Sequence, residues 1–104
     1  MLLRELIKCV KGAEVSGEDV EVLGVCEDSR KVRAGDVFVA RRGTKVKGMA
    51  FVREAIERGA VVIVSEEEAP RGSVVVDIPW VKVPDANLAA ALLYMRSRDD
   101  RRRA

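Results

Sequence analysis

The sequence predicts an α/β fold with a mixed sheet of about five strands and helices on both faces. Continuous apolar runs at residues 37–40 and 60–65 are typical of strands buried on both sides. Around them, apolar residues recur at helical spacing in residues 1–10, in residues 49–58 and from residue 84 onward. Strands that alternate with amphipathic helices favour a sheet layered between helices.

Length and composition indicate one domain with an aliphatic core. A chain of 104 residues is the size of a single domain, and its 48% hydrophobic content is enough to build a core. Only 4% of the residues are aromatic, so valine, leucine and alanine must fill that core. No repeat or linker divides the chain.

The first elements are a helix and a strand separated by a polar stretch. Residues 1–10 are expected to form an amphipathic helix that stops near Gly12. Residues 13–21 are polar and are expected to form a loop, and residues 22–26 a short strand. The apolar face of the helix comprises Leu3, Leu6, Ile7 and Val10.

The middle of the chain follows a strand–helix–strand pattern. Residues 37–40 predict a central strand, and residues 49–58 predict a helix that Gly59 ends. Residues 60–65 predict a second buried strand, and residues 66–72 predict an exposed connection. The expected apolar face of the helix is Val52, Ala55 and Ile56.

The last third predicts two strands and a helix. Residues 74–78 and 80–83 have strand composition, and Pro79 between them is expected to break or bend the sheet edge. Pro84 and Asp85 begin the last helix, with Asp85 as its N-cap. Leu88, Ala91, Leu92 and Met95 are its expected apolar face. Residues 96–104 are rich in charge and are expected to fray, so the folded domain is residues 1–95.

Charge and hydropathy narrow the classes of partner that this chain is expected to bind. Charged residues make up 35% of the chain, but the net charge is only +2, which is typical of a solvated surface and not of a nucleic-acid-binding one. Charged residues interrupt the first ten positions, so we expect no signal peptide, and no apolar run reaches membrane-spanning length. We therefore expect a cytoplasmic protein that binds neither membranes nor nucleic acid.

The cysteines do not predict a metal site or a disulfide. Cys9 falls in a helical pattern and Cys26 in a strand pattern, and the chain has no histidine. We expect two buried, reduced thiols, as is usual for free cysteines.

Two polar loops flank the strand at residues 37–40. The first, residues 28–36, carries Asp28, Ser29 and Arg30, and the second, residues 41–48, carries two glycines and four basic residues. Such loops beside strands form concave sites in which backbone N–H groups can face an anion. The residues alone leave two interpretations open: a ligand site, or side chains that cap a turn while the basic residues meet solvent.

A thirteen-position pattern within this region is much more specific. Residues 28–40 read D-S-R-x-V-x-x-G-D-x-F-x-A, which resembles the amino-terminal domain of the Mur ligases. These enzymes add amino acids to UDP-N-acetylmuramoyl (UDP-MurNAc) peptides in cell-wall peptidoglycan synthesis. The likeness continues through Gly43, Gly48, Phe51 and the A-I-x-x-G-A run at residues 55–60, and it covers about residues 2–95. Within the family it is greatest to the ligase that extends UDP-MurNAc-L-Ala-D-Glu (MurE), with MurF next.

The resemblance implies a uridine diphosphate site and a binding role. By motif position, the nucleotide would contact Glu27, Ser29 and Arg30 on the first loop. From the second loop it would contact Thr44, Lys45 and Val46. The implied partners are UDP-MurNAc-L-Ala-D-Glu, or a related UDP-sugar peptide, and the central ATPase domain of a parent ligase.

The sequence also departs from the family pattern. Lys47-Gly48-Met49 stands where D-G-H is usual, and Cys26 stands where threonine is common. No G-x-x-x-x-G-K-[ST] phosphate-binding loop occurs, so the ATP and magnesium of the parent family belong to a domain outside these residues. We expect this domain to need no cofactor of its own and to bind without catalysing. The alternative is a non-enzymatic protein-interaction module that reuses the fold.

Overall fold

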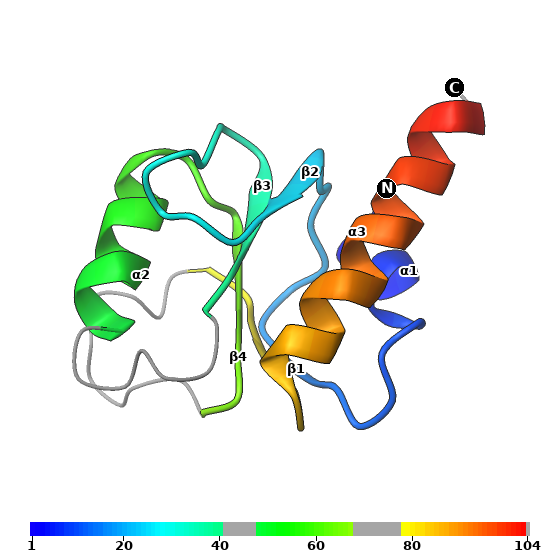
Figure 1. Cartoon of the computed structure of the whole chain (residues 1–104), viewed down its shortest axis with the longest axis horizontal. Coiled ribbons are helices and arrows are strands. Elements are labelled where there is room, and N and C mark those ends of the chain that lie inside the picture. Colours follow the sequence, from blue (N-terminus) through cyan, green and yellow to red (C-terminus); the bar gives the residue numbers. More distant parts are fainter. Residues whose placement is uncertain (41–47, 68–77, 104) are drawn as a thin grey trace.

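The structure of the chain is a computed structural model that describes residues 1–40, 48–67 and 78–103. Within these residues a five-stranded mixed sheet is layered between helices, with α2 on one face and α1 and α3 on the other (Figure 1). This arrangement confirms the predicted fold class. In chain order the elements are α1 (Leu3–Ile7), β1 (Glu14–Ser16), β2 (Gly24–Cys26), β3 (Asp36–Val39), α2 (Gly48–Glu57), β4 (Val62–Ser65), β5 (Trp80–Lys82) and α3 (Ala86–Arg103).

The sheet has one antiparallel strand beside a parallel block. Its order is β1-β5-β4-β3-β2, and β2, β3, β4 and β5 pair in parallel. The edge strand β1 pairs antiparallel with β5, so that Val15 lies opposite Val81. The parallel strands are covered on both faces, which explains their continuous apolar sequences.

Alternating side chains of the central strands build two separate cores. In β3, Val37 and Val39 pack with α1 and α3, whereas Phe38 packs with α2; in β4, Ile63 likewise lies on the α2 side. The core on the α2 side contains Cys26, Val32, Phe38, Val52, Ala55, Ala60, Ile63 and Trp80. The strands therefore tie the two helical layers together.

The end of α2 shows why Gly59 is required there. The Ala60 N–H donates to the carbonyl of Ala55, and the Gly59 N–H donates to that of Ile56, which is the hydrogen-bond pattern of a Schellman motif. Gly59 has a φ of +113°, and a Cβ at this position would lie 2.6 Å from the Cα of Ala34. The predicted end of this helix is confirmed.

The prediction that residues 13–21 form a loop is wrong at Glu14–Ser16, which form the strand β1. Its three residues pair with β5, but only Val15 is partly buried, between the exposed Glu14 and Ser16. A short, exposed edge strand carries almost no hydrophobic signal. Because β1 occupies the edge, β5 is an interior strand and not the edge strand that Pro79 was expected to bend.

The predicted strand at residues 74–78 is not among the described strands. Residues 74–77 lie outside the described residues, and Ile78 is a bend before β5. The strands predicted at residues 22–26, 60–65 and 80–83 are present with shorter bounds, and the one predicted at 37–40 is shifted by one residue to Asp36–Val39.

The buried face of α3 differs from the predicted one. The prediction placed Leu88, Ala91, Leu92 and Met95 against the core, but Leu88 is 57% and Met95 66% exposed. Ala91 is exposed as well, and Leu92 is only partly buried. The residues that α3 buries are Ala86, Ala89, Ala90 and Leu93.

Two acidic side chains cap the start of α3. The Asp85 carboxylate accepts a hydrogen bond from the Leu88 N–H at 3.1 Å, which confirms the predicted N-cap. The Glu66 carboxylate accepts from the Ala86 N–H at 2.9 Å, so this acidic residue has a structural role. The helix is described to Arg103, and its last turns extend past the sheet (Figure 1). Fraying of residues 96–104 stays a prediction.

The cysteines are both free thiols. Cys26 is buried in the core on the α2 side, whereas Cys9 is partly buried against the core on the α1 and α3 side. In the described part of the chain, no helix combines the length and apolarity needed to cross a bilayer.

Candidate functional site

The loop that joins β2 to β3 carries the sequence motif. It begins directly after Cys26, at the carboxyl end of β2, where the parallel neighbour β3 also ends. Val32 anchors it in the core on the α2 side, and the Lys31 N–H donates to the Asp28 carbonyl at 2.9 Å to close a turn. The Cys26 thiol donates to the same carbonyl at 3.1 Å. Carboxyl ends of parallel strands are where α/β proteins usually bind ligands.

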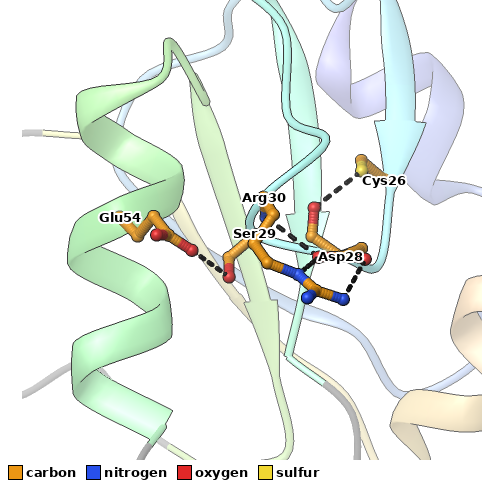
Figure 2. Close-up of polar contacts among 5 residues, drawn as sticks. All are labelled: Cys26, Asp28, Ser29, Arg30 and Glu54. Carbon is orange, nitrogen blue, oxygen red and sulfur yellow. Dashed lines mark hydrogen bonds and ion pairs between the residues drawn. The ribbon is translucent and has the colours of Figure 1, made fainter.

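The centre of the site is a hydrogen bond between the loop and α2. The Ser29 hydroxyl donates to the Glu54 carboxylate, with 2.6 Å between the two oxygens, and the two side chains point toward each other (Figure 2). Ser29 is only 5% exposed, and it is the single polar residue in the buried set of the described chain. A bond this short to a carboxylate is charge-assisted, so it fixes both side chains.

Beside it, Asp28 and Arg30 form a pair within the loop. The Asp28 carboxylate accepts from the Arg30 backbone N–H at 2.9 Å, and from the guanidinium through two contacts of 3.2 Å (Figure 2). The guanidinium hydrogen bond holds the pKa of Asp28 below its usual value, and the same bond raises the pKa of Arg30. This cation is therefore already engaged with a carboxylate.

A cavity of about 690 Å³ opens between the loop and α2. Its polar wall is the loop together with Glu54, and its apolar wall is formed by Phe38, Ala40 and Phe51. The lining residues are Glu27, Asp28, Ser29, Arg30, Phe38, Ala40, Phe51 and Glu54. An apolar pocket with a few fixed polar groups is the usual form of a small-molecule site.

The structure brings together half of the predicted site residues. Glu27, Ser29 and Arg30 all line the cavity. Thr44, Lys45 and Val46 lie outside the described residues, so their predicted contacts stay predictions. The same holds for Lys47 and for the side chain of Met49.

Glu54 and Phe51 are site residues that the sequence reasoning did not identify. Both lie on α2, one helical turn apart, beside the buried face that contains Val52 and Ala55. Glu54 is 25 residues from its partner Ser29, so no local pattern links the two. The available signal was a carboxylate flanking the apolar face of a predicted helix.

Comparison with known proteins supports the family resemblance that the motif at residues 28–40 indicated. The family model described as "Mur ligase family, catalytic domain" matches residues 21–97, about three quarters of the chain. The chain belongs to the Mur ligase family. The match contains the β2–β3 loop and α2, so the cavity described above lies within the family-defining part of the chain.

Individual Mur ligases are similar over most of this chain. A UDP-N-acetylmuramoyl-L-alanyl-D-glutamate–2,6-diaminopimelate ligase of Bacteroides thetaiotaomicron is 40% identical over 83% of the chain, and that of Geobacter sulfurreducens is 40% identical over 95%. A UDP-N-acetylmuramyl-tripeptide synthetase of a Roseiflexus species is 40% identical over 89%. The chain spans only 18–20% of the length of these relatives, and it corresponds to the amino-terminal domain of the family.

Solved structures show the same fold. A crystal structure of MurF from Acinetobacter baumannii superposes on 93% of this chain with a TM-score of 0.64, although the sequences are 22% identical and the match covers 21% of that protein. The sequence relatives are MurE-type ligases, as the motif predicted, and the match to MurF shows that the fold is shared.

Proposed function

We propose that this chain is the UDP-MurNAc-peptide-binding domain of a cytoplasmic amino-acid ligase of peptidoglycan synthesis, and that by itself it binds and does not catalyse. The observation that carries the proposal is the cavity at the carboxyl ends of β2 and β3, which the family motif lines with Glu27, Ser29 and Arg30. The relatives are named as ligases of UDP-N-acetylmuramoyl or UDP-N-acetylmuramyl peptides, which supports a substrate of this class.

In this proposal the role of the domain is positional. The loop and cavity hold the uridine diphosphate end of the substrate, so that the distant peptide carboxylate reaches a central ATPase domain of the parent ligase. Thr44, Lys45 and Val46 remain proposed contacts on the resemblance alone. The predicted substrate is UDP-MurNAc-L-Ala-D-Glu or a related UDP-sugar peptide.

Neither the sequence motifs nor the described residues offer a site for ATP and magnesium. The sequence lacks the G-x-x-x-x-G-K-[ST] loop that holds nucleotide phosphates. Among residues 1–40, 48–67 and 78–103, no three acidic, histidine or cysteine side chains gather as metal ligands do. We therefore assign the binding of substrate, and no chemical step, to these residues.

Isothermal titration of the 104-residue chain with UDP-MurNAc-L-Ala-D-Glu tests the proposal. We expect saturable heat and shifts of the amide signals around Ser29 and α2. Because Ser29 lines the cavity, Ser29→Ala should weaken binding by about tenfold, the value of one well-placed hydrogen bond. Ser16→Ala on the exposed edge strand β1 is the matched control and should bind like the unchanged chain.

The absence of heat and of amide shifts at saturating ligand would refute the binding role. Equal affinity of Ser29→Ala and Ser16→Ala would mean that the ligand binds elsewhere on the domain.

A non-enzymatic interaction module is the second candidate, and one observation favours it. The outward side of α3 exposes Leu88 and Met95, and large exposed apolar side chains on one helix are typical of protein contacts. Light scattering across a concentration series separates the two functions. Self-association that Met95→Gln removes, with no binding of the UDP substrate, would favour the module.

A further inference from the structure

We propose that Tyr94 is a positioning residue of the candidate site: from α3 it holds the backbone of Glu27, and so it links the state of this helix to the affinity of the cavity for its ligand. This role rests on the proposed function. It adds support from outside the cavity wall, because the described residues of α3 are not among those that line the cavity.

Tyr94 lies on the part of α3 that packs alongside the edge strand β2 (Figure 1). It is 37% exposed and the neighbouring Leu93 is fully buried, so the helix carries the tyrosine ring at the border of its buried face. Within the described sheet, β2 is an edge strand with β3 as its neighbour. Backbone groups on the outer side of an edge strand need partners from other elements.

The contact that carries the proposal is a hydrogen bond that the Glu27 backbone N–H donates to the Tyr94 phenol oxygen. Glu27 is the first residue after β2, and it lines the cavity. Burial raises the pKa of Tyr94, and the nearby Cys26 and Glu27 groups raise it further, so the phenol keeps its proton at neutral pH. The helix therefore places a neutral acceptor at the start of the site loop.

Other hydrogen bonds of this loop act within it. The Cys26 thiol and the Lys31 N–H both donate to the Asp28 carbonyl. The Arg30 N–H donates to the Asp28 carboxylate. These bonds give the turn its internal shape, whereas the bond to Tyr94 ties the residue before the turn to α3. It therefore fixes where the loop begins relative to that helix.

This arrangement has two consequences for ligand binding. Without the phenol oxygen, the start of the loop would populate further conformations, and the apparent affinity falls in proportion to the fraction that stays competent to bind. Coupling between two sites is reciprocal, so a ligand that holds the loop should also restrain α3 around Tyr94. A hydroxyl that only supports the fold would change stability and leave both quantities unchanged.

The first experiment titrates the full 104-residue chain with uridine diphosphate and compares it with Tyr94→Phe. The substitution keeps the ring and removes one oxygen. We expect Tyr94→Phe to bind about three- to tenfold more weakly, the value of one hydrogen bond. Ser97→Ala removes a hydroxyl three residues later on the same helix, away from the lining residues, and as the matched control it should bind like the unchanged chain.

The second experiment uses Tyr94 as a reporter, because it is the only tyrosine in the chain. Labelling the ζ carbon of tyrosine with carbon-13 gives a single phenol signal. Although Tyr94 does not line the cavity, this signal should shift with uridine diphosphate at the midpoint that the titration gives. Hydrogen exchange of the α3 amides around Tyr94 should slow at saturating ligand, and Tyr94→Phe should lose most of that slowing.

Equal affinity of Tyr94→Phe and Ser97→Ala would overturn the positioning role even if Tyr94→Phe is less stable, since the hydroxyl would then serve the fold alone. The role also fails, while uridine diphosphate binding stands, if the ligand binds without changing the phenol signal or the exchange of α3. If uridine diphosphate does not bind at all, the proposed function fails as well. Should Tyr94→Phe not fold, the phenol signal and the exchange of the unchanged chain still decide.

Discussion

Asp28 and Arg30 keep the site loop in one conformation without burying either charge. The Asp28 carboxylate receives the backbone N–H two residues ahead together with the guanidinium, which is how aspartate stabilises a turn. Arg30 is largely exposed, so the pair stabilises the loop locally and adds little to overall stability. The effect of this ion pair should appear in the pKa of the Asp28 carboxyl.

We predict that the Asp28 carboxyl titrates below the usual aspartate pKa of about 3.9. Since the folded pKa is lowered, the stabilisation is present above the unfolded pKa and is lost as the pH falls through the folded one. Carboxyl NMR titration measures the pKa. Arg30→Gln removes the guanidinium bond and should move the pKa back up, whereas Arg33→Gln should not. An unchanged pKa in Arg30→Gln would contradict the assigned cause.

At the residue scale, the sequence predicted positions whose role is local. Gly59 follows from the end of a helical pattern and Asp85 from its place before one, whereas Ser29 was singled out only through the family resemblance. Glu54 could not be predicted, because its role depends on a loop 25 residues away meeting one side of α2. That contact is set by how α2 packs on the sheet.

At the scale of elements, α3 shows where periodicity is insufficient. Its apolar residues form two opposite faces, and counting them could not show which one the fold buries. The structure buries the face of small residues, Ala86, Ala89 and Ala90, which allow the helix to approach the core closely. The larger Leu88 and Met95 point away from it.

Leucine-to-alanine substitutions on the two faces of α3 should change the free energy of unfolding by very different amounts. Leu93 is fully buried, so Leu93→Ala should lower the free energy of unfolding by about 2–5 kcal/mol. Leu88→Ala deletes the same atoms from an exposed side chain, and it should change that free energy by less than about 0.5 kcal/mol. Urea denaturation of both variants measures the difference. Equal losses would mean that both faces of α3 are packed.

The strand β1 was missed for a different physical reason. Its pairing energy comes from backbone hydrogen bonds with β5, and backbone groups leave no trace in the sequence. The interior strands were predictable because burial on both sides demands continuous apolar runs.

At the scale of the whole molecule, the sheet is shared by both cores. Val62 and Val64 pack toward α1 and α3, while Ile63 between them packs toward α2. Neither helical layer can lose its core without disturbing strands that the other layer needs. This arrangement favours one cooperative unit.

We predict that two probes of unfolding give the same transition. Trp80 is the only tryptophan, it is buried in the core on the α2 side, and its indole N–H donates to the Glu67 carbonyl at 2.8 Å. Its fluorescence and the far-UV circular dichroism, to which the long helix α3 on the opposite face contributes, should yield one midpoint in urea. Helical signal lost before the fluorescence changes would show that the layer of α1 and α3 unfolds separately.

The placement of the two cysteine thiols provides a natural labelling scheme. Cys9 packs against the layer of α1 and α3, and Cys26 against the layer of α2, with the sheet between them. A brief pulse of an alkylating reagent followed by peptide mass analysis would therefore record the opening of each layer on its own. No engineered reporter is needed, since each side of the sheet already has one free thiol.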